Sequence, residues 1–136
     1  MRRNRVIPES NNIIWTVTDP QDRKVVLKNS TFDFHIAGTD HDENDSNFRK
    51  KIAAQAKQTI VEPEFIVNEE QRNIYFSLVK VPYENNLLKI KPMKVVVDAD
   101  RTPNEVVTWT VMRKMNDTIK SEAIIYERNS NELVPV

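Results

Sequence analysis

The chain has 136 residues, the size of one ordinary domain, and its 20 basic and 20 acidic side chains give it a formal net charge of zero. Hydrophobic residues make up 39% and charged residues 29%, which excludes a disordered chain, and no run of about 20 apolar residues predicts a membrane span. The absence of cysteine excludes disulfides and thiolate zinc sites and predicts a reducing, cytoplasmic location. The single glycine, Gly38, excludes the glycine-rich phosphate loops of nucleotide-binding proteins.

The N-terminal region of the chain predicts a tail followed by a β-hairpin. Residues 1–12 are polar and predict a flexible tail, which leaves a single domain over 13–136. β-Branched and aromatic residues over 13–18 predict a strand, and a proline turn at 19–22 follows it. Residues 24–27 predict the returning strand of the hairpin.

Two helices are expected next. A short helix over 31–37 begins after a serine N-cap and ends at Gly38. A longer helix is expected over 47–61, because its apolar residues recur every four positions and Pro63 stops it. The polar loop between the two helices holds His41.

The second half of the chain predicts strands. Apolar residues in alternating or continuous runs indicate four strands of an antiparallel meander, over 65–67, 74–81, 88–97 and 106–112. Residues 124–126 fit either an edge strand or a short helix. The sequence therefore predicts an α+β fold, in which an N-terminal hairpin and two helices pack on a meander sheet of about four strands.

Several polar side chains are candidates for function, and each has a simpler explanation. His35 suits proton transfer because histidine titrates near neutral pH, but it could equally be a surface residue of its helix. Arg49 belongs to a basic helix face that is typical of a solvated surface. Tyr75, Lys94 and Thr108 are polar positions within apolar strands, which either face solvent or share one polar patch.

Neither the histidines nor the acidic loop predicts a metal site. His35 and His41 lie six residues apart, which is not the spacing of two ligands on one helix face. The loop at 40–45 begins with the alternating acidic residues of a calcium loop but lacks its glycine and its final glutamate. We expect no metal and no cofactor.

The order of motifs resembles that of a known family. The motifs are, in chain order, Trp15 to Pro20 followed by Val25-Val26-Leu27, the aromatic and His-Ile segment Phe32 to Ile36, His41-Asp42-Glu43, Ile60 to Ile66, and the paired strands Lys94 to Val97 and Val106 to Thr108. This order resembles phage-encoded nuclease-like domains of the barnase–EndoU–colicin E5/D–RelE group. The third motif is similar to that family's His-Pro-Glu element, with the proline replaced.

The resemblance implies a RelE- or barnase-like fold and metal-independent cleavage of RNA, in which the ribose 2′-hydroxyl attacks the adjacent phosphate. It implies a toxin or phage effector that acts on RNA and has a protein inhibitor or antitoxin. The residues that it assigns to catalysis are His35, Arg72 and Thr108, and those that it assigns to substrate binding are Arg49, Tyr75, Lys94 and His41. The alternatives are an inactive binding module on the same fold, or a phage structural or immunity protein.

Overall fold

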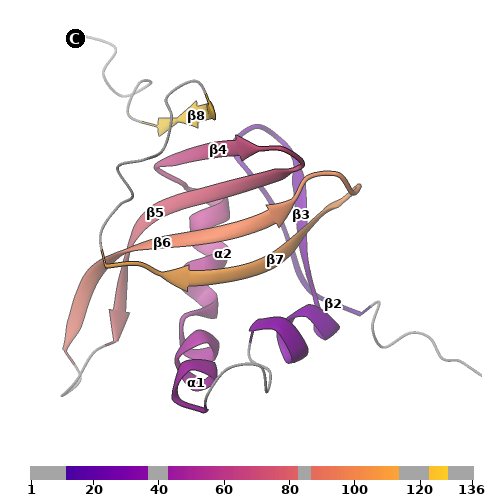
Figure 1. The fold of residues 1–136 in the computed structure, drawn as a ribbon. Coiled ribbons are helices and arrows are strands. Elements are labelled where there is room, and N and C mark those ends of the chain that lie inside the picture. The colour runs from indigo at the N-terminus through magenta and orange to yellow at the C-terminus, as the bar shows by residue number, and fades with distance from the viewer. Residues whose placement is uncertain (1–11, 37–42, 83–86, 114–122, 129–136) are drawn as a thin grey trace, which may run out of the picture.

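The computed structural model of the protein describes residues 12–36, 43–82, 87–113 and 123–128 (Figure 1). Two strands and a short π-helix come first along the chain, a pair of α-helices follows, and five further strands complete the fold. The elements are β2 (Ile13–Thr18), β3 (Lys24–Lys28), η2 (Thr31–Ile36), α1 (Glu43–Lys51), α2 (Ala53–Val61), β4 (Phe65–Glu69), β5 (Arg72–Pro82), β6 (Leu88–Asp98), β7 (Asn104–Val111) and β8 (Ile124–Glu127).

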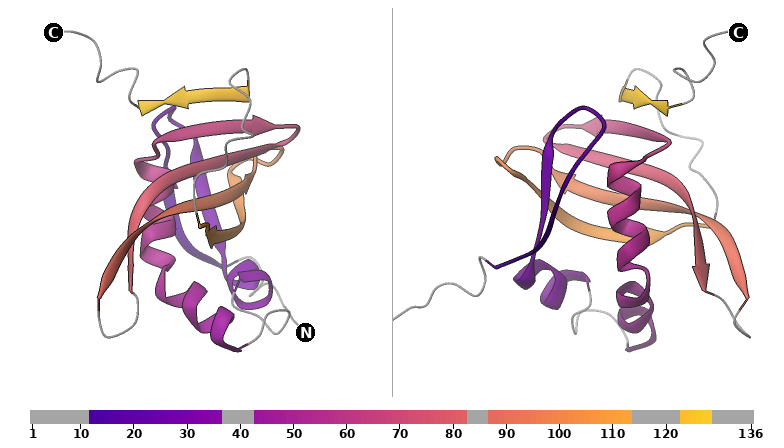
Figure 2. Two further views of the ribbon diagram at one scale, coloured as in Figure 1. Left: turned by 60° about the vertical axis from the view of Figure 1, so that its left-hand side comes forward. Right: turned by 180° about the vertical axis from the view of Figure 1, so that it is seen from behind.

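All the described strands belong to one twisted sheet. It has seven strands in the order β2-β3-β7-β6-β5-β4-β8. Neighbouring strands are antiparallel except for β3 and β7, which are parallel. Figure 2 shows α2 crossing one face of this sheet, while α1 and η2 lie near its lower edge.

The predicted fold class is wrong, because the hairpin and the meander are not separate layers. Strand β3 pairs with the start of β7, Val25 opposite Asn104 and Val26 opposite Glu105, and so joins the hairpin to the sheet. Strand β8 extends the sheet at its other side by pairing with β4. The physical reason lies in β3 itself, whose continuous apolar run is fully buried, as in a strand with neighbours on both sides.

The longer helix is also divided. One non-helical residue, Ile52 (φ −103°, ψ 18°), separates α1 from α2 within the predicted helix 47–61. The main-chain bonds from Ile52 to Phe48 (3.2 Å) and from Ala56 to Ile52 (3.0 Å) continue across the break. The predicted apolar stripe therefore survives, and Ile52, Ala56 and Ile60 are all fully buried.

The core lies between α2 and the sheet. Alternate residues of the central strands turn toward the helix, and they include Tyr75, Val95 and Trp109, none of which is exposed to solvent. The predicted strands at 13–18 and 65–67 are confirmed, with β4 two residues longer than expected. Of the two alternatives for 124–126, the edge strand is confirmed as β8.

Some predictions fall on segments of the chain that the structure does not describe. Nearly all of the predicted tail, Gly38 and residues 39–42 of the predicted loop, His41 among them, lie outside the described residues. Residues 43 and 44, also expected in that loop, instead begin α1. In the described ranges, no helix combines the length and the apolar character that crossing a membrane requires.

Candidate anion-binding cleft

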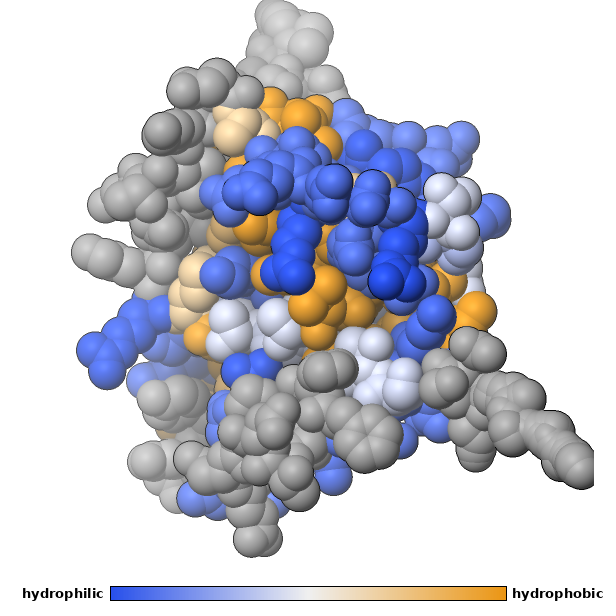
Figure 3. Space-filling model, turned by 45° about the vertical axis from the view of Figure 1, so that its right-hand side comes forward, coloured by the Kyte–Doolittle hydropathy of each residue, from blue (hydrophilic) through white to orange (hydrophobic). Residues whose placement is uncertain are grey.

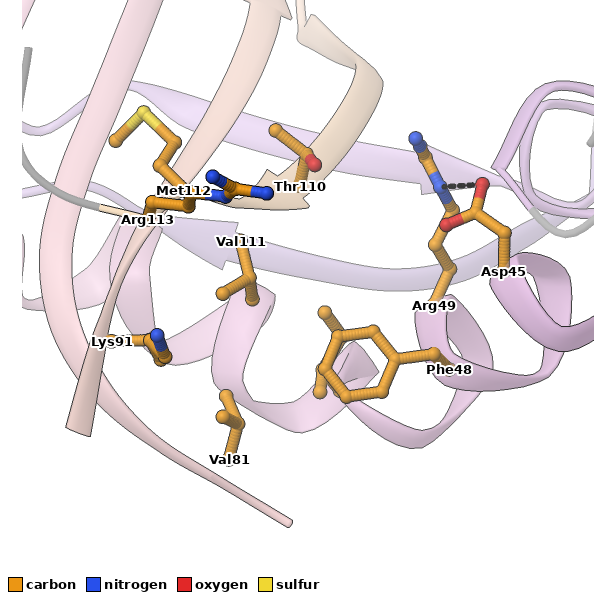
Figure 4. Close-up of a pocket in the computed structure, with 10 residues that line it drawn as sticks. Asp45, Phe48, Arg49, Val81, Lys91, Thr110, Val111, Met112 and Arg113 are labelled. Carbon is orange, nitrogen blue, oxygen red and sulfur yellow. Dashed lines mark hydrogen bonds and ion pairs between the residues drawn. The ribbon is translucent and has the colours of Figure 1, made fainter. Parts of the chain in front are cut away.

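A cleft of about 280 Å³ opens between α1 and the ends of the three central strands (Figure 4). Helix α1 provides one wall, and β5, β6 and the end of β7 provide the other. The lining residues are Asp45, Phe48, Arg49, Ile52, Val81, Lys91, Thr110, Val111, Met112 and Arg113.

The floor of the cleft is apolar. Phe48 belongs to the stripe of α1 that faces the sheet, and its half-buried ring lies across from Val81 and Val111 (Figure 4). Ile52 and Val81 are almost fully buried beneath it. A ring held in this way offers a flat apolar surface to a ligand, because some of its area stays accessible.

The rim of the cleft is cationic. Figure 4 shows Lys91 and Arg113 on the strand side, and Arg49 with Asp45 on the helix side. Arg49 is paired with Asp45 at 3.2 Å, whereas neither Lys91 nor Arg113 forms an ion pair or side-chain hydrogen bond within the described ranges. Two cations with no partner in the described part of the chain, placed over an apolar floor, form a site suited to an anion with a flat apolar group.

Arg49 anchors the helix to the free edge of β7. Strand β3 covers only the start of β7, so the carbonyl of Trp109 has no strand partner on that side. The Nη1 group of Arg49 donates to this carbonyl at 2.9 Å and to the Thr108 hydroxyl at 3.0 Å. The indole N–H of Trp109 donates to the Arg49 carbonyl at 3.0 Å, so reciprocal hydrogen bonds between these two residues hold α1 against β7.

Tyr75 belongs to a buried network and not to the cleft. Its ring is fully buried, and its hydroxyl donates to Asp19 Oδ2 at 2.6 Å. Asp19 also accepts hydrogen bonds from the main chain of Gln21 and Arg23 and from the Arg23 side chain. Burial raises the pKa of Tyr75 well above its ordinary value, and the hydrogen bond to Asp19 raises it further. No face of this ring is accessible to an RNA base.

The structure brings some of the predicted residues together. Arg49 and Thr108 are in direct contact, and the main chain of His35 lies in η2, which packs against β7 and α1. The rings of Phe32 in η2 and Trp109 in β7 lie 5.9 Å apart, so this contact is close. His41 lies outside the described residues.

Two other predicted residues lie away from that contact. Arg72 is the first residue of β5 and pairs with Asp98 of β6, so one strand lies between Arg72 and β7, the strand of Thr108. At the usual spacing of neighbouring strands, β5 and β7 are about 10 Å apart. Arg72 sits next to the β4–β5 turn, opposite Glu69. The face of the molecule seen in Figure 3 is mostly hydrophilic, with smaller hydrophobic areas between. Lys94 lies opposite Thr110, on the sheet face that also carries Thr108.

Sequence reasoning missed the residues that define the cleft. Lys91 lies within a predicted strand and belongs to no motif, although its pairing with Val79 turns it to the same face as Val81. Arg113 follows directly on the last predicted strand and belongs to no motif either. The sequence contains one indication of the cleft, which is Phe48. It is an aromatic residue at the end of the apolar stripe and is followed by basic residues, a combination that indicates a partly exposed packing contact.

In comparisons with protein-family models, curated proteins and solved structures, nothing matches the chain. The resemblance to the barnase–EndoU–colicin E5/D–RelE group therefore stays a prediction. Among the described residues no group of three or more His, Asp or Glu side chains is arranged to hold a metal ion.

Proposed function

We propose that the domain binds single-stranded RNA in the cleft between α1 and the ends of β5, β6 and β7. The observation that carries the proposal is a pair of cations, Lys91 and Arg113, that have no partner among the described residues and lie over the partly accessible ring of Phe48. Single-stranded RNA offers both complementary groups, a phosphate for the cations and a base that stacks on an aromatic ring. Duplex binding is disfavoured, because the chain has no net positive charge with which to follow two backbones.

Fluorescence anisotropy with a labelled single-stranded RNA tests this proposal. The variant combines Lys91→Gln with Arg113→Gln, and the control combines Lys24→Gln with Lys57→Gln, which removes two charges from exposed positions outside the cleft. We expect the cleft variant to bind about 5- to 30-fold more weakly, for a loss of about 1–2 kcal/mol. The control should keep wild-type affinity apart from a small non-specific loss.

Two further readouts separate phosphate contact from general charge. The dependence of log K on log salt should become shallower by about 1.4 in the cleft variant, since each lost phosphate contact to a single strand reduces it by about 0.7. Phe48→Leu keeps an apolar side chain in the floor and removes the ring face, so we expect it to weaken binding by about 1–3 kcal/mol. Equal affinities for the cleft and control variants would refute the site.

A second candidate function is RNA cleavage, and the position of η2 favours it. The short helix η2, which contains His35, packs against β7 and α1, the elements that carry Thr108 and Arg49, so a histidine, a hydroxyl and a guanidinium belong to three adjacent elements. In such a reaction a base removes the 2′-hydroxyl proton, the resulting oxygen attacks phosphorus, and the 5′-oxygen leaves with a proton.

Cleavage is tested with a fluorescent single-stranded RNA in EDTA, with wild type beside His35→Ala. Cutting by the wild type alone supports metal-independent cleavage that depends on His35. If neither protein cuts several RNA sequences while both are folded and bind RNA, the binding module is the function and cleavage is rejected.

A further inference from the structure

Half of β5 lies at an open edge of the sheet. The strand pairs with β6 along its whole length, but with β4 only from Arg72 to Phe76. Among the described residues, the remaining segment, Ser77 to Pro82, therefore has a neighbouring strand on one side only, and Figure 1 shows it extending beyond β4 together with β6. We call this segment the β5 edge.

The main-chain groups of the β5 edge point toward the open side at alternate residues. The Phe76 carbonyl accepts from the Glu64 main chain at 2.7 Å, and the Lys80 carbonyl accepts from the Gln55 side chain at 2.9 Å. The main-chain N–H and carbonyl groups of successive residues point to opposite sides of a strand. Leu78, which lies between Phe76 and Lys80 at the same spacing, must therefore also direct its N–H and carbonyl toward the open side. Its partner on β6 is Pro92, which has no N–H, and this agrees with that orientation.

Gln55 already occupies one hydrogen-bonding position of an absent neighbouring strand. A glutamine side chain ends in the same amide group as a peptide bond, and its Nε2 donates to Lys80 as a strand N–H would. Its Oε1 is buried and has no hydrogen-bond partner among the described residues. Gln55 lines a groove of about 470 Å³ that runs between α2 and the β5 edge. An incoming N–H would satisfy this oxygen, which is otherwise costly to bury.

The charges around the edge select the kind of strand that fits. On the face of the β5–β6 hairpin that carries Leu78, the described arms, residues 77–82 and 87–94, hold two lysines, Lys80 and Lys94, and no acidic residue. Leu78 and Ile90 are 54% and 64% exposed on the same face of the hairpin. Two copies paired through this edge would bring their lysines together, which disfavours self-association.

We propose that the β5 edge takes up an extended, acidic segment of a partner protein as an additional strand. The segment bonds to the main chain at Leu78 and Lys80 and donates an N–H to Gln55 Oε1. Because successive side chains of a strand point to opposite faces, its acidic side chains lie on the face that carries Lys80, and its apolar ones face the groove beside α2. This is recognition by strand addition, in which main-chain bonds give affinity and side chains give selectivity. It rests on a different surface from the RNA cleft and does not depend on that proposal.

The test uses a short synthetic peptide of alternating valine and glutamate, added to the isotope-labelled full chain. We expect amide hydrogen exchange to slow at Leu78 and Lys80. A peptide of alternating valine and lysine, and the acidic peptide N-methylated at alternate amides, should each bind at least about tenfold more weakly. Loss of either preference, or no binding by the acidic peptide, would overturn the proposal.

Variants distinguish the edge from other surfaces. Leu78→Pro removes the outward N–H, and Lys80→Glu reverses the local charge without altering the main chain. We expect Leu78→Pro to abolish the exchange effect and Lys80→Glu to remove the preference for the acidic peptide. If Leu78→Pro does not fold, Lys80→Glu decides alone, and unchanged preference in it would refute the charge selection.

Other occupants give different results. Concentration-dependent dimerisation that slows exchange at Leu78 without peptide would show that a second copy fills the edge, against the proposal. Fast exchange at Leu78 only in a chain that ends at residue 128 would assign the edge to the protein's own C-terminal residues, and would also overturn it.

Discussion

The substitution Tyr75→Phe, which removes one hydroxyl oxygen from the core, tests the buried hydrogen-bond network around Asp19. In Tyr75→Phe the ring stays and only the hydrogen bond to Asp19 Oδ2, 2.6 Å long, is lost. Hydrogen bonds to a charged group contribute about 1.5–3 kcal/mol, and Asp19 keeps three other donors, so we expect a loss of that size at neutral pH. Tyr126→Phe is the control, because the Tyr126 hydroxyl makes no hydrogen bond in the described structure, and we expect it to cost less than about 0.5 kcal/mol.

The same pair of proteins gives a pH dependence whose sign follows from the raised pKa of Tyr75. A group whose pKa is higher in the folded than in the unfolded state contributes fully to the free energy of unfolding at pH values below its unfolded pKa, and this contribution falls as the pH rises above that value. For tyrosine the unfolded pKa is about 10. The advantage of the wild type over Tyr75→Phe should therefore be constant up to about pH 9 and shrink by about 1.4 kcal/mol by pH 11.

Urea unfolding followed by circular dichroism measures both effects, and using the difference between the two proteins cancels the titration of all other groups. An unchanged stability in Tyr75→Phe at pH 7, or a difference that grows above pH 10, would refute the reasoning about this network.

Two further predictions concern the packing of the helices. Trp109→Phe removes the donor to the Arg49 carbonyl and leaves space in the core, so we expect a loss of about 2 kcal/mol or more in guanidinium unfolding. Ile60→Ala should cost about 2–5 kcal/mol, because Ile60 is fully buried, whereas Val61→Ala at the adjacent exposed position should cost less than about 0.5 kcal/mol. Similar losses for the Ile60 and Val61 variants would contradict the assigned orientation of α2.

The sequence located most elements but not their assembly. Local signals sufficed for β2, β5 and the stripe of α2, since alternation and four-residue spacing follow directly from strand and helix geometry. The parallel pairing of β3 with β7 joins residues about eighty positions apart, and no local pattern records such a contact. The continuous apolar run of β3 was the one sign that this strand has neighbours on both sides.

The predicted site residues divide in the same way. Residue type suggested Arg49 and Thr108, and the structure places them in contact. Tyr75 looked like a polar position on a strand, but its hydroxyl is satisfied by Asp19, fifty-six residues away, and the whole ring is buried. The cleft itself depends on where the ends of three strands meet α1, which is set by tertiary packing and not by any motif.

The most direct measurement of RNA binding in the cleft is a titration of the isotope-labelled protein with a short single-stranded RNA, followed residue by residue. We expect saturable chemical-shift changes at Phe48, Lys91 and Thr110 to Arg113, with little change at the β4–β5 turn around Arg72. Changes centred on that turn, or none at RNA concentrations where anisotropy reports binding, would contradict the assignment of the cleft.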